Sequence, residues 1–297
     1  MLVFGSCGVL ADNLFVGYGS GGVGTAAIDK FNTDVGAGSQ STFASGLDNP
    51  YGLAFDARGN LFAADATSDS IYKFIPSGAR STFASGLTDP SGVAFDDVGN
   101  LFVGDSGNNA DGHIYKFTPS GSRSTCASGL NAHLGLVFDK AGNLFQADAT
   151  GNIYKYTPGG ARSTFASGLF TRQGLAFDSV GDLFAAEQAN GIIYKFTPDG
   201  SRSVFASSLQ RPGGLAFDSS GNLFVADYNS GNIYEFNPEG GRSTFASGLS
   251  FPFGLAFEPV PEPSVWAIIT LGFGFGLALH RRLLICAPRA GGSLKWR

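Results

Sequence analysis

The feature of this chain that most constrains its fold is a sequence phrase that returns about every 40 residues. Read from Gly214, the phrase is GLAFDSSGNLFVADYNSGNIYEFNPEGGRSTFASGL. Its other copies begin with the same glycine, namely Gly52, Gly92, Gly135, Gly174 and, in a copy that soon breaks off, Gly254. A fixed period of this length is typical of an array in which each repeat is one supersecondary unit.

Each full copy contains four short apolar runs separated by Gly, Asn and Pro. In the copy from Gly214 the runs are GLAF, NLFVAD, NIYEF and RSTFAS, which have the length of strands and are too short for helices. The segment between the first two runs keeps Asp first and Gly fourth, as in 56–60 and 96–100, which favours a tight hairpin turn. We therefore expect each repeat to be a four-stranded antiparallel meander.

The two ends of the repeat region complement each other. The copy at 254–258 supplies only a first run, while residues 13–47 contain NLFVGY, AAIDKF and STFASGL, which match the second, third and fourth runs. The sequence therefore predicts an all-β fold, a six-bladed β-propeller of four-stranded antiparallel blades over residues 12–258, with one blade closed by strands from both termini. Such closure leaves no open sheet edge.

The repeated pattern also supports a family resemblance. The order Pro-x-Gly-Leu-Ala-Phe-Asp, Gly-Asn-Leu-Phe-Val-Ala-Asp and Asn-Ile-Tyr-Lys-Phe resembles the NHL-repeat class of β-propellers. The resemblance implies the propeller fold and leaves the function open. Lyases and lactone hydrolases also occur on six-bladed propellers, so the fold alone does not separate a binding protein from an enzyme.

Composition narrows the class of partner. Charged residues are 14% of the chain and the formal net charge is −5, with no Lys/Arg cluster in the repeat region. These features argue against a nucleic-acid partner. Each full copy carries one Arg before its fourth run, and we expect these side chains to be solvated on outer strands: Arg80, Arg123, Arg162, Arg202 and Arg242.

Three cysteines do not indicate a disulfide framework. Cys126 stands at the position that Phe83, Phe165, Phe205 and Phe245 occupy in other copies. We therefore expect Cys126 to be a packing residue.

The C-terminal part has the organisation of a membrane anchor. Residues 259–264 are a predicted linker around Pro261, Glu262 and Pro263, residues 265–285 a predicted transmembrane helix, and residues 286–297 a polar tail. The run 265–279 carries no charge and is followed by Arg281 and Arg282. Basic residues stay on the cytoplasmic side of a span, so we expect the propeller on the other side.

A Pro-Glu-Pro triplet, an apolar helix and an arginine pair near a chain end resemble the PEP-CTERM sorting signal of Gram-negative bacteria. The resemblance implies an exosortase as partner, removal of the tail, and display or release at the cell surface. Members normally end soon after the arginines, whereas this chain continues with LLICAPRAGGSLKWR. Residues 1–11 read as the last part of a signal peptide, with Val9 and Ala11 at the spacing of a cleavage site. We expect an exported protein, transiently anchored in the cell envelope or released outside the cell.

Carboxylates recur at two positions of the repeat, and recurrence indicates that they build blades. Asp56 and its counterparts are predicted hairpin residues. A second set ends the second strand and is expected to cap the loop that follows: Asp65, Asp105, Asp148, Glu187 and Asp227. No Gly-x-Ser-x-Gly elbow and no Cys–His pairing occurs in the sequence, so we predict no catalytic residue.

One segment of the sequence offers oxygen ligands for a metal ion. The sequence DSGNNADG, in the lengthened copy from Gly92, presents oxygen ligands of the kind Ca²⁺ takes at Asp105, Asn108, Asn109 and Asp111. It lacks the sixth-position Gly and distal Glu of an EF-hand loop. We therefore expect no cofactor and no metal, with Ca²⁺ at this segment as the alternative.

The predicted ligand site lies where neighbouring repeats depart from the common pattern. Four copies have Pro two residues before the repeat glycine, whereas two adjacent copies have His133 and Arg172. On the same predicted rim these copies carry Asp148 and Glu187, the latter followed by Gln188. We predict an anionic or hydroxyl-rich ligand, with His133 and Arg172 as donors and the carboxylates as acceptors. The alternative is that these are solvated loop residues.

The sequence thus predicts an exported, surface-displayed propeller that acts as a non-enzymatic binding or structural module of the bacterial cell envelope. Its expected partner, besides the exosortase, is a polysaccharide or another envelope protein. The alternative is a propeller enzyme of lyase or lactone hydrolase type, with its site on the rim that carries His133 and Arg172.

Overall fold

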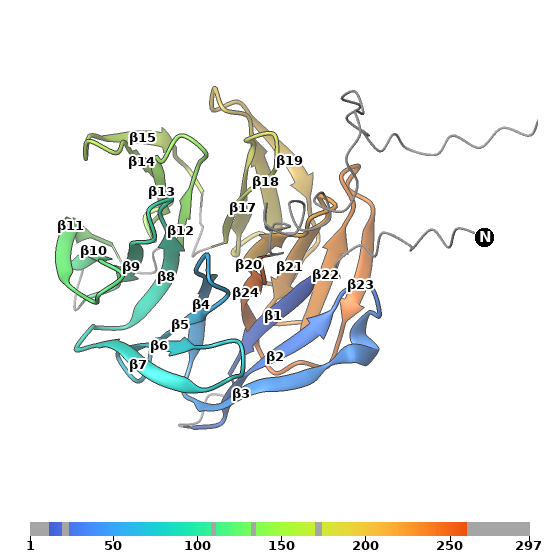
Figure 1. Ribbon diagram of the computed structural model, residues 1–297. Coiled ribbons are helices and arrows are strands. Elements are labelled where there is room, and N and C mark those ends of the chain that lie inside the picture. The colour runs from blue at the N-terminus through green and yellow to red at the C-terminus, as the bar shows by residue number, and fades with distance from the viewer. Residues whose placement is uncertain (1–11, 20–23, 108–110, 132–134, 170–173, 260–297) are drawn as a thin grey trace, which may run out of the picture. The chain divides into compact units, whose positions relative to one another are not determined.

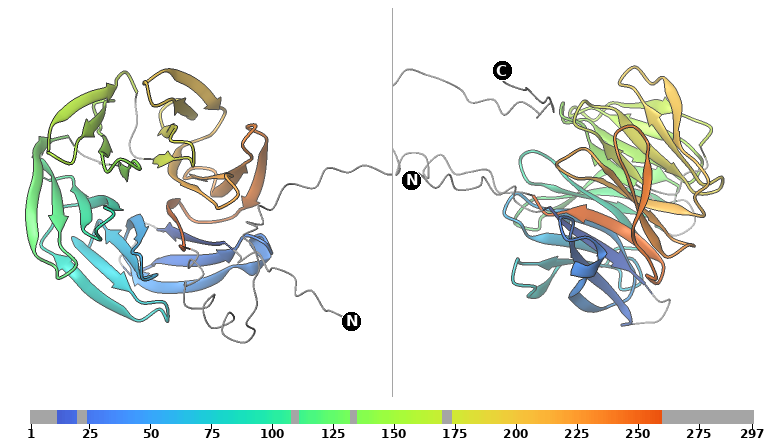
Figure 2. Two further views of the ribbon diagram at one scale, coloured as in Figure 1. Left: turned by 45° about the horizontal axis from the view of Figure 1, so that its top comes forward. Right: turned by 90° about the vertical axis from the view of Figure 1, so that its right-hand side faces the viewer.

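The computed structural model describes residues 12–19, 24–107, 111–131, 135–169 and 174–259. Within these ranges the chain forms 24 β-strands and one 3₁₀ turn, η1 (Ala37–Ser39). The strands make six four-stranded antiparallel sheets, which stand as blades around a central axis (Figure 1, Figure 2). The predicted six-bladed β-propeller is confirmed. No helix in these ranges has the length and apolar character needed to cross a membrane, and the expected anchor at 265–285 lies outside them.

Each blade runs from an innermost to an outermost strand. The split blade contains β24 (Pro252–Phe257), β1 (Asn13–Tyr18), β2 (Ala26–Asn32) and β3 (Ser41–Leu47). The second blade contains β4 (Pro50–Phe55), β5 (Leu61–Asp65), β6 (Ser70–Phe74) and β7 (Arg80–Ser85). The third contains β8 (Pro90–Phe95), β9 (Leu101–Asp105), β10 (Gly112–Phe117) and β11 (Arg123–Leu130).

The remaining three blades follow the same order. The fourth contains β12 (Gly135–Phe138), β13 (Leu144–Ala147), β14 (Ile153–Tyr156) and β15 (Arg162–Ala166). The fifth contains β16 (Leu175–Phe177), β17 (Leu183–Glu187), β18 (Ile192–Phe196) and β19 (Arg202–Ala206). The sixth contains β20 (Pro212–Phe217), β21 (Leu223–Asp227), β22 (Asn232–Phe236) and β23 (Arg242–Ala246).

The split blade joins strands from opposite ends of the repeat region. β24 pairs antiparallel with β1, with Leu14 opposite Phe257 and Val16 opposite Leu255. Both Leu14 and Val16 are fully buried in the core shared with the sixth blade. The predicted closure is confirmed, and the innermost strands contact one another in sequence around the whole ring.

The core is divided into six apolar clusters, each between two neighbouring blades. Second strands such as β5 and β21 are buried at every residue, because blades cover both of their faces. Between the second and third blades, the ring of Phe83 packs edge-on against Phe62 of its own blade, with ring centroids 5.0 Å apart, and against Phe117 of the third blade, with centroids 5.9 Å apart. Edge-to-face pairs of this kind stabilise aromatic cores beyond simple burial.

The recurring Asp and Arg residues mostly have the structural roles predicted for them. Asp56 Oδ1 accepts hydrogen bonds from the backbone N–H groups of Arg58 and Asn60, and Oδ2 accepts one from the Asn60 amide. The Arg residues that begin the fourth strands are exposed, as expected, and lie over tyrosines of the third strands, for example Arg80 over Tyr72 at 4.9 Å. These contacts shape the hairpins and outer strands, not a site.

The repeat glycine has a steric cause at the axis, where innermost strands approach each other closely. A Cβ at Gly52 would lie 2.0 Å from the carbonyl oxygen of Ser91, and one at Gly214 would lie 2.0 Å from that of Phe253. Contacts this short do not occur between real atoms, so the tight centre of the ring requires glycine.

Candidate functional site

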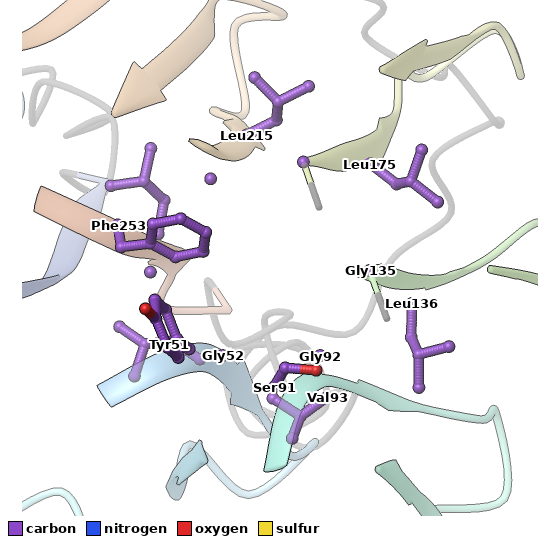
Figure 3. A pocket seen from close by; sticks show the side chains of 15 residues that line it. Tyr51, Gly52, Ser91, Gly92, Val93, Gly135, Leu136, Leu175, Leu215 and Phe253 are labelled. Atoms are coloured by element: carbon purple, nitrogen blue, oxygen red, sulfur yellow. The ribbon is translucent and has the colours of Figure 1, made fainter. Parts of the chain in front are cut away.

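A shallow pocket opens at the centre of the ring (Figure 3). Its volume is ≈ 100 Å³, and the innermost strands of all six blades line it, mainly through glycines and through Leu53, Leu136, Leu175, Leu215 and Leu255. Tyr51 and Phe253 lie side by side at its edge, with ring centroids 4.7 Å apart and nearly perpendicular planes. Ser91 brings a hydroxyl group to the pocket. The lining side chains are therefore mostly apolar or aromatic, while the backbone at the glycines supplies polar groups to the pocket surface.

The loops that enter the first strands and the loops that follow the second strands lie at one end of the propeller, which we call the rim. On this rim, which carries Tyr51 and Phe253, carboxylates at the ends of second strands fix the positions of the loops. Asp65 accepts hydrogen bonds from the backbone N–H groups of Asp48 (2.9 Å) and Asn49 (2.8 Å). Asp227 does the same for Gln210 (2.9 Å) and Arg211 (2.7 Å). The expectation that this set caps the loop following the second strand is wrong for these residues. They hold the loop that enters the first strand, because both loops lie on the same rim.

Asp105 belongs to the same set and to the candidate Ca²⁺ segment. Its carboxylate accepts hydrogen bonds from the backbone N–H groups of Thr88 and Gly107, and burial raises its pKa against the effect of these bonds. Asp111 lies 4.0 Å from the Nε2 atom of His113, while Asn108 and Asn109 lie outside the described residues. Within the described ranges no three His, Cys, Asp or Glu residues are grouped as metal ligands would be.

Only some of the residues predicted as a ligand site lie in the described part of the chain. His133 and Arg172 lie outside the described residues. Asp148 is buried, and its Oδ1 atom accepts hydrogen bonds from Thr150 N, Thr150 Oγ1 and Asn152 N, so this member of the set caps the following turn as expected. Glu187 and Gln188 are buried where β17 ends on the rim. Gln188 lies on the side of the fifth blade that faces the sixth blade.

Gln188 connects the predicted site to residues that were not predicted. Its Oε1 atom accepts a hydrogen bond of 3.4 Å from Nε of Arg211. The Arg211 guanidinium lies over the ring of Tyr228 at 4.9 Å, and Tyr228 packs against Phe251 at 4.9 Å. Tyr228 also approaches Phe253 at 6.3 Å. We call Gln188, Arg211, Tyr228, Phe251, Phe253 and Tyr51 the rim cluster.

Phe251 is the most unusual member of the rim cluster. Its side chain is 44% exposed, and its backbone has φ of 54°, in the left-handed region. A bulky residue in that region carries strain of about 1–2 kcal/mol, and strained residues cluster at functional sites. The fold thus holds an exposed aromatic ring on the rim in a conformation that glycine or asparagine would adopt more easily.

Tyr228 keeps its hydroxyl proton at neutral pH. Burial raises the pKa of its phenol, Tyr51 raises it further, and Arg211 opposes the shift. The rim cluster therefore presents a phenol and a guanidinium as hydrogen-bond donors beside aromatic faces. An arrangement of this kind suits a ligand with hydroxyl groups and apolar ring faces.

The sequence contained a signal for the rim cluster that the proline comparison missed. The position after the rim proline reads Tyr51, Ser91, Gly213 and Phe253 in four copies, and the position before it includes Arg211 and Phe251. Both positions vary while their neighbours repeat. A comparison of every position around the proline would have marked this rim.

The chain matches no protein-family model and no curated protein. Solved structures match over most of its length, with TM-score 0.74 and 21% identity to a chain of a nidogen/laminin complex, covering 84% of this chain and 98% of that one. A putative gluconolactonase matches with TM-score 0.62 and 16% identity over 71% of this chain and 82% of its own. Virginiamycin B lyase from Staphylococcus aureus matches with TM-score 0.61 and 14% identity over 82% and 91%.

These neighbours include a propeller from a protein complex and two proteins with enzyme names. At such low identity the likeness shows the fold alone, and it supports the expected NHL-like propeller.

Proposed function

We propose that this chain is an exported, surface-displayed propeller that binds a neutral, hydroxyl-rich polysaccharide across the rim cluster. The observation that carries the proposal is the stack of Arg211, Tyr228 and Phe251, in which donors and aromatic faces stand together on one rim. Sugar rings offer hydroxyl groups to such donors and apolar faces to such rings.

The size of the central pocket favours a polymer over a small metabolite. Sites that enclose small molecules usually measure about 300–1,000 Å³, whereas the central pocket has ≈ 100 Å³. A ligand therefore lies across the rim instead of entering the ring. A polysaccharide, whose successive units contact an extended surface, fits this geometry.

The state of the rim carboxylates favours binding over catalysis. Asp65, Asp105 and Asp227 are buried and accept backbone N–H hydrogen bonds that hold the rim loops. A carboxylate used in this way is not placed to serve as a general acid or base toward a substrate. These residues act as a scaffold that positions Arg211 and its neighbours.

Export and display are proposed from the chain ends. Pro261, Glu262 and Pro263, the uncharged run at 265–279, and Arg281 and Arg282 stand in the order that resembles the sorting signal of an exosortase substrate. A polysaccharide ligand agrees with a protein that works at the cell surface. The exosortase is then the processing partner and the polysaccharide the ligand of the mature propeller.

Binding of the purified full chain to neutral and acidic oligosaccharides, measured by calorimetry, tests the proposal. Arg211→Ala and Tyr228→Ala should each weaken binding by more than about tenfold, because each removes a central contact. The matched controls are Arg242→Ala and Tyr234→Ala, which break a similar stacked pair, 5.0 Å apart, on the outer strands. The controls should bind normally. Binding that is insensitive to Arg211 and Tyr228, selective capture of a protein in place of a glycan, or turnover of a lactone would contradict the proposal.

A further inference from the structure

A second pocket lies far from the axis, between the third and fourth blades. It has a volume of ≈ 400 Å³, and we call it the lateral pocket. Its main side-chain walls are Phe102, Lys116, Cys126, Phe138, Leu144 and Tyr156. The corresponding space between the second and third blades, lined by Phe62, Lys73, Phe83, Phe95 and Leu101, measures only ≈ 130 Å³.

One side chain accounts for the difference between the two spaces. Phe83 fills the smaller one, where its ring contacts Phe62 at 5.0 Å and Phe117 at 5.9 Å. Cys126 stands at the same repeat position and lacks the ring. The expectation that Cys126 is a packing residue is therefore wrong, since it is exposed and borders an open pocket.

Two further departures from the repeat fall in the same interface. Gln146 replaces the alanine or valine of the other second strands, and Tyr156 replaces the phenylalanine of the other third strands. Tyr156 lines the lateral pocket, and Gln146 shares the strand face of Leu144, which also lines it, because residues two apart point the same way. Three departures in one interface indicate a built feature of the fold and not scattered drift.

The two polar groups that Gln146 and Tyr156 bring to this interface are buried beside the pocket. The hydroxyl of Tyr156 donates a hydrogen bond of 3.2 Å to Oε1 of Gln146, whose side chain is fully buried. Nε2 of Gln146 is buried without a hydrogen-bond partner in the described part of the chain. A buried polar atom in this state costs stability, so ordinary core packing does not explain its presence.

We propose that the lateral pocket binds a small neutral molecule with one aromatic ring, held where the other blades place a phenylalanine. The ring lies edge-on between Phe102 and Tyr156, in the arrangement that Phe83 has with Phe62 and Phe117. The site is separate from the rim cluster, and neither site depends on the other.

The charges at the mouth select a neutral ligand. Lys116 is paired with Asp96 at 3.5 Å and lies over the Phe102 ring at 5.2 Å, while Asp97 adds an exposed carboxylate. An anionic ligand meets two carboxylates, and a cationic one meets a lysine that is already engaged. The volume is ample, since an apolar cavity of about 150 Å³ is enough to bind benzene.

Binding in the lateral pocket is non-covalent. Although Cys126 is accessible from the pocket, partial desolvation by the surrounding protein raises the pKa of its thiol, with Lys116 opposing the shift, so the group stays protonated at neutral pH. A protonated thiol is a poor nucleophile. Cys126 thus contributes space and not reactivity.

Titration of the full chain with fluorobenzene, followed by ¹⁹F NMR, tests the proposal. Saturable binding at one site per chain is expected. Cys126→Phe restores the residue of the other blades and should weaken binding by more than roughly tenfold, whereas Cys126→Ala keeps the space open and should bind within about twofold of the parent. Phe83→Cys should open a second site and raise the stoichiometry to two.

Three results would overturn the proposal: no saturable binding by the parent chain, binding by Cys126→Phe at the parent's affinity, or loss of binding in Cys126→Ala. Thermal unfolding of each variant separates loss of the pocket from loss of the fold. Cys126→Phe should unfold at or above the temperature of the parent, because it fills a cavity.

Discussion

The side-chain amide of Asn13 donates a hydrogen bond of 2.8 Å to the carboxylate of Glu258, which lies 245 residues later in the chain. The backbone N–H of Glu258 in turn donates to the carbonyl oxygen of Asn13 at 2.9 Å. Lys30 adds an ion pair of 3.3 Å to the same carboxylate. The two ends of the repeat region are thus joined by side chains as well as by the ladder between β1 and β24.

Deletion of β24 should unfold the propeller. The deletion exposes Leu14 and Val16, which are now fully buried, and leaves β1 as an open edge. Domains are stabilised by only about 5–15 kcal/mol in total, so loss of a whole core strand is expected to unfold the domain. Circular dichroism at 25 °C should show loss of native structure, whereas Glu258→Gln should change the free energy of unfolding by less than about 1 kcal/mol. A cooperatively folded deletion variant would mean that the array is stable while open.

Gly214→Ala should destabilise the ring from its centre. The new Cβ would lie 2.0 Å from the carbonyl oxygen of Phe253, so the sixth and split blades must move apart. Overpacking of this kind costs about 1–3 kcal/mol or more, measurable by urea unfolding. Gly38→Ala is the matched control, because no heavy atom beyond its two chain neighbours lies within 4 Å of its Cβ position. Equal stability of the two variants would show that the ring tolerates spreading.

Ser208→Gly should stabilise the protein. Ser208 has φ of 63°, and the same turn position in other copies holds glycines with φ near this value, such as Gly86 at 68° and Gly248 at 77°. Relief of the left-handed strain should gain about 1 kcal/mol, which raises the melting temperature by about 2–4 °C in a domain of this size. Gly248→Ser should lower it by a similar amount. Calorimetry that finds shifts of the opposite sign would exclude backbone strain as the cause.

The fold can be predicted from the sequence because the runs present in each copy show where the repeat region begins and ends. Residues 13–47 lack a first run and 254–258 lack the other three, so their pairing followed from counting runs. The role of Asp227 was harder to predict, since the sequence does not say which of two loops on one rim a carboxylate reaches. Hydrogen bonds to Gln210 and Arg211 decide this only in three dimensions.

The candidate site is harder to predict from the sequence than the fold, because it depends on contacts between positions that do not repeat. His133 and Arg172 stand out because they replace proline, whereas Tyr228 and Phe251 occupy positions that have no common residue among the copies. Their contact at 4.9 Å depends on how the loop that enters β24 folds over the end of the second strand of the sixth blade, which only the three-dimensional structure shows. The sequence does not reveal the lateral pocket, because the repeat predicts a packing role for Cys126, whereas the structure shows that Cys126 leaves the space open.

Replacement of Pro261, Glu262 and Pro263 by alanines should block processing of the tail. The exosortase is expected to read this triplet together with the apolar run and the arginines, so the variant should remain unprocessed in the membrane fraction. Mass spectrometry of intact protein from fractionated cells measures the outcome. A triplet variant with the mass and distribution of the parent would refute the sorting role, while the propeller itself would be unaffected.

The most direct test of the proposed function is a hydrogen-exchange footprint of the full chain with its tightest-binding oligosaccharide. Occupation of the rim cluster should slow exchange in 210–213, 228–231 and 250–253, which surround Arg211, Tyr228 and Phe251 on the rim. Residues 218–222, in a hairpin at the opposite end of the sixth blade, should exchange as in the free protein. Protection of 218–222 with no change at 210–213 or 228–231 would contradict binding at the rim cluster.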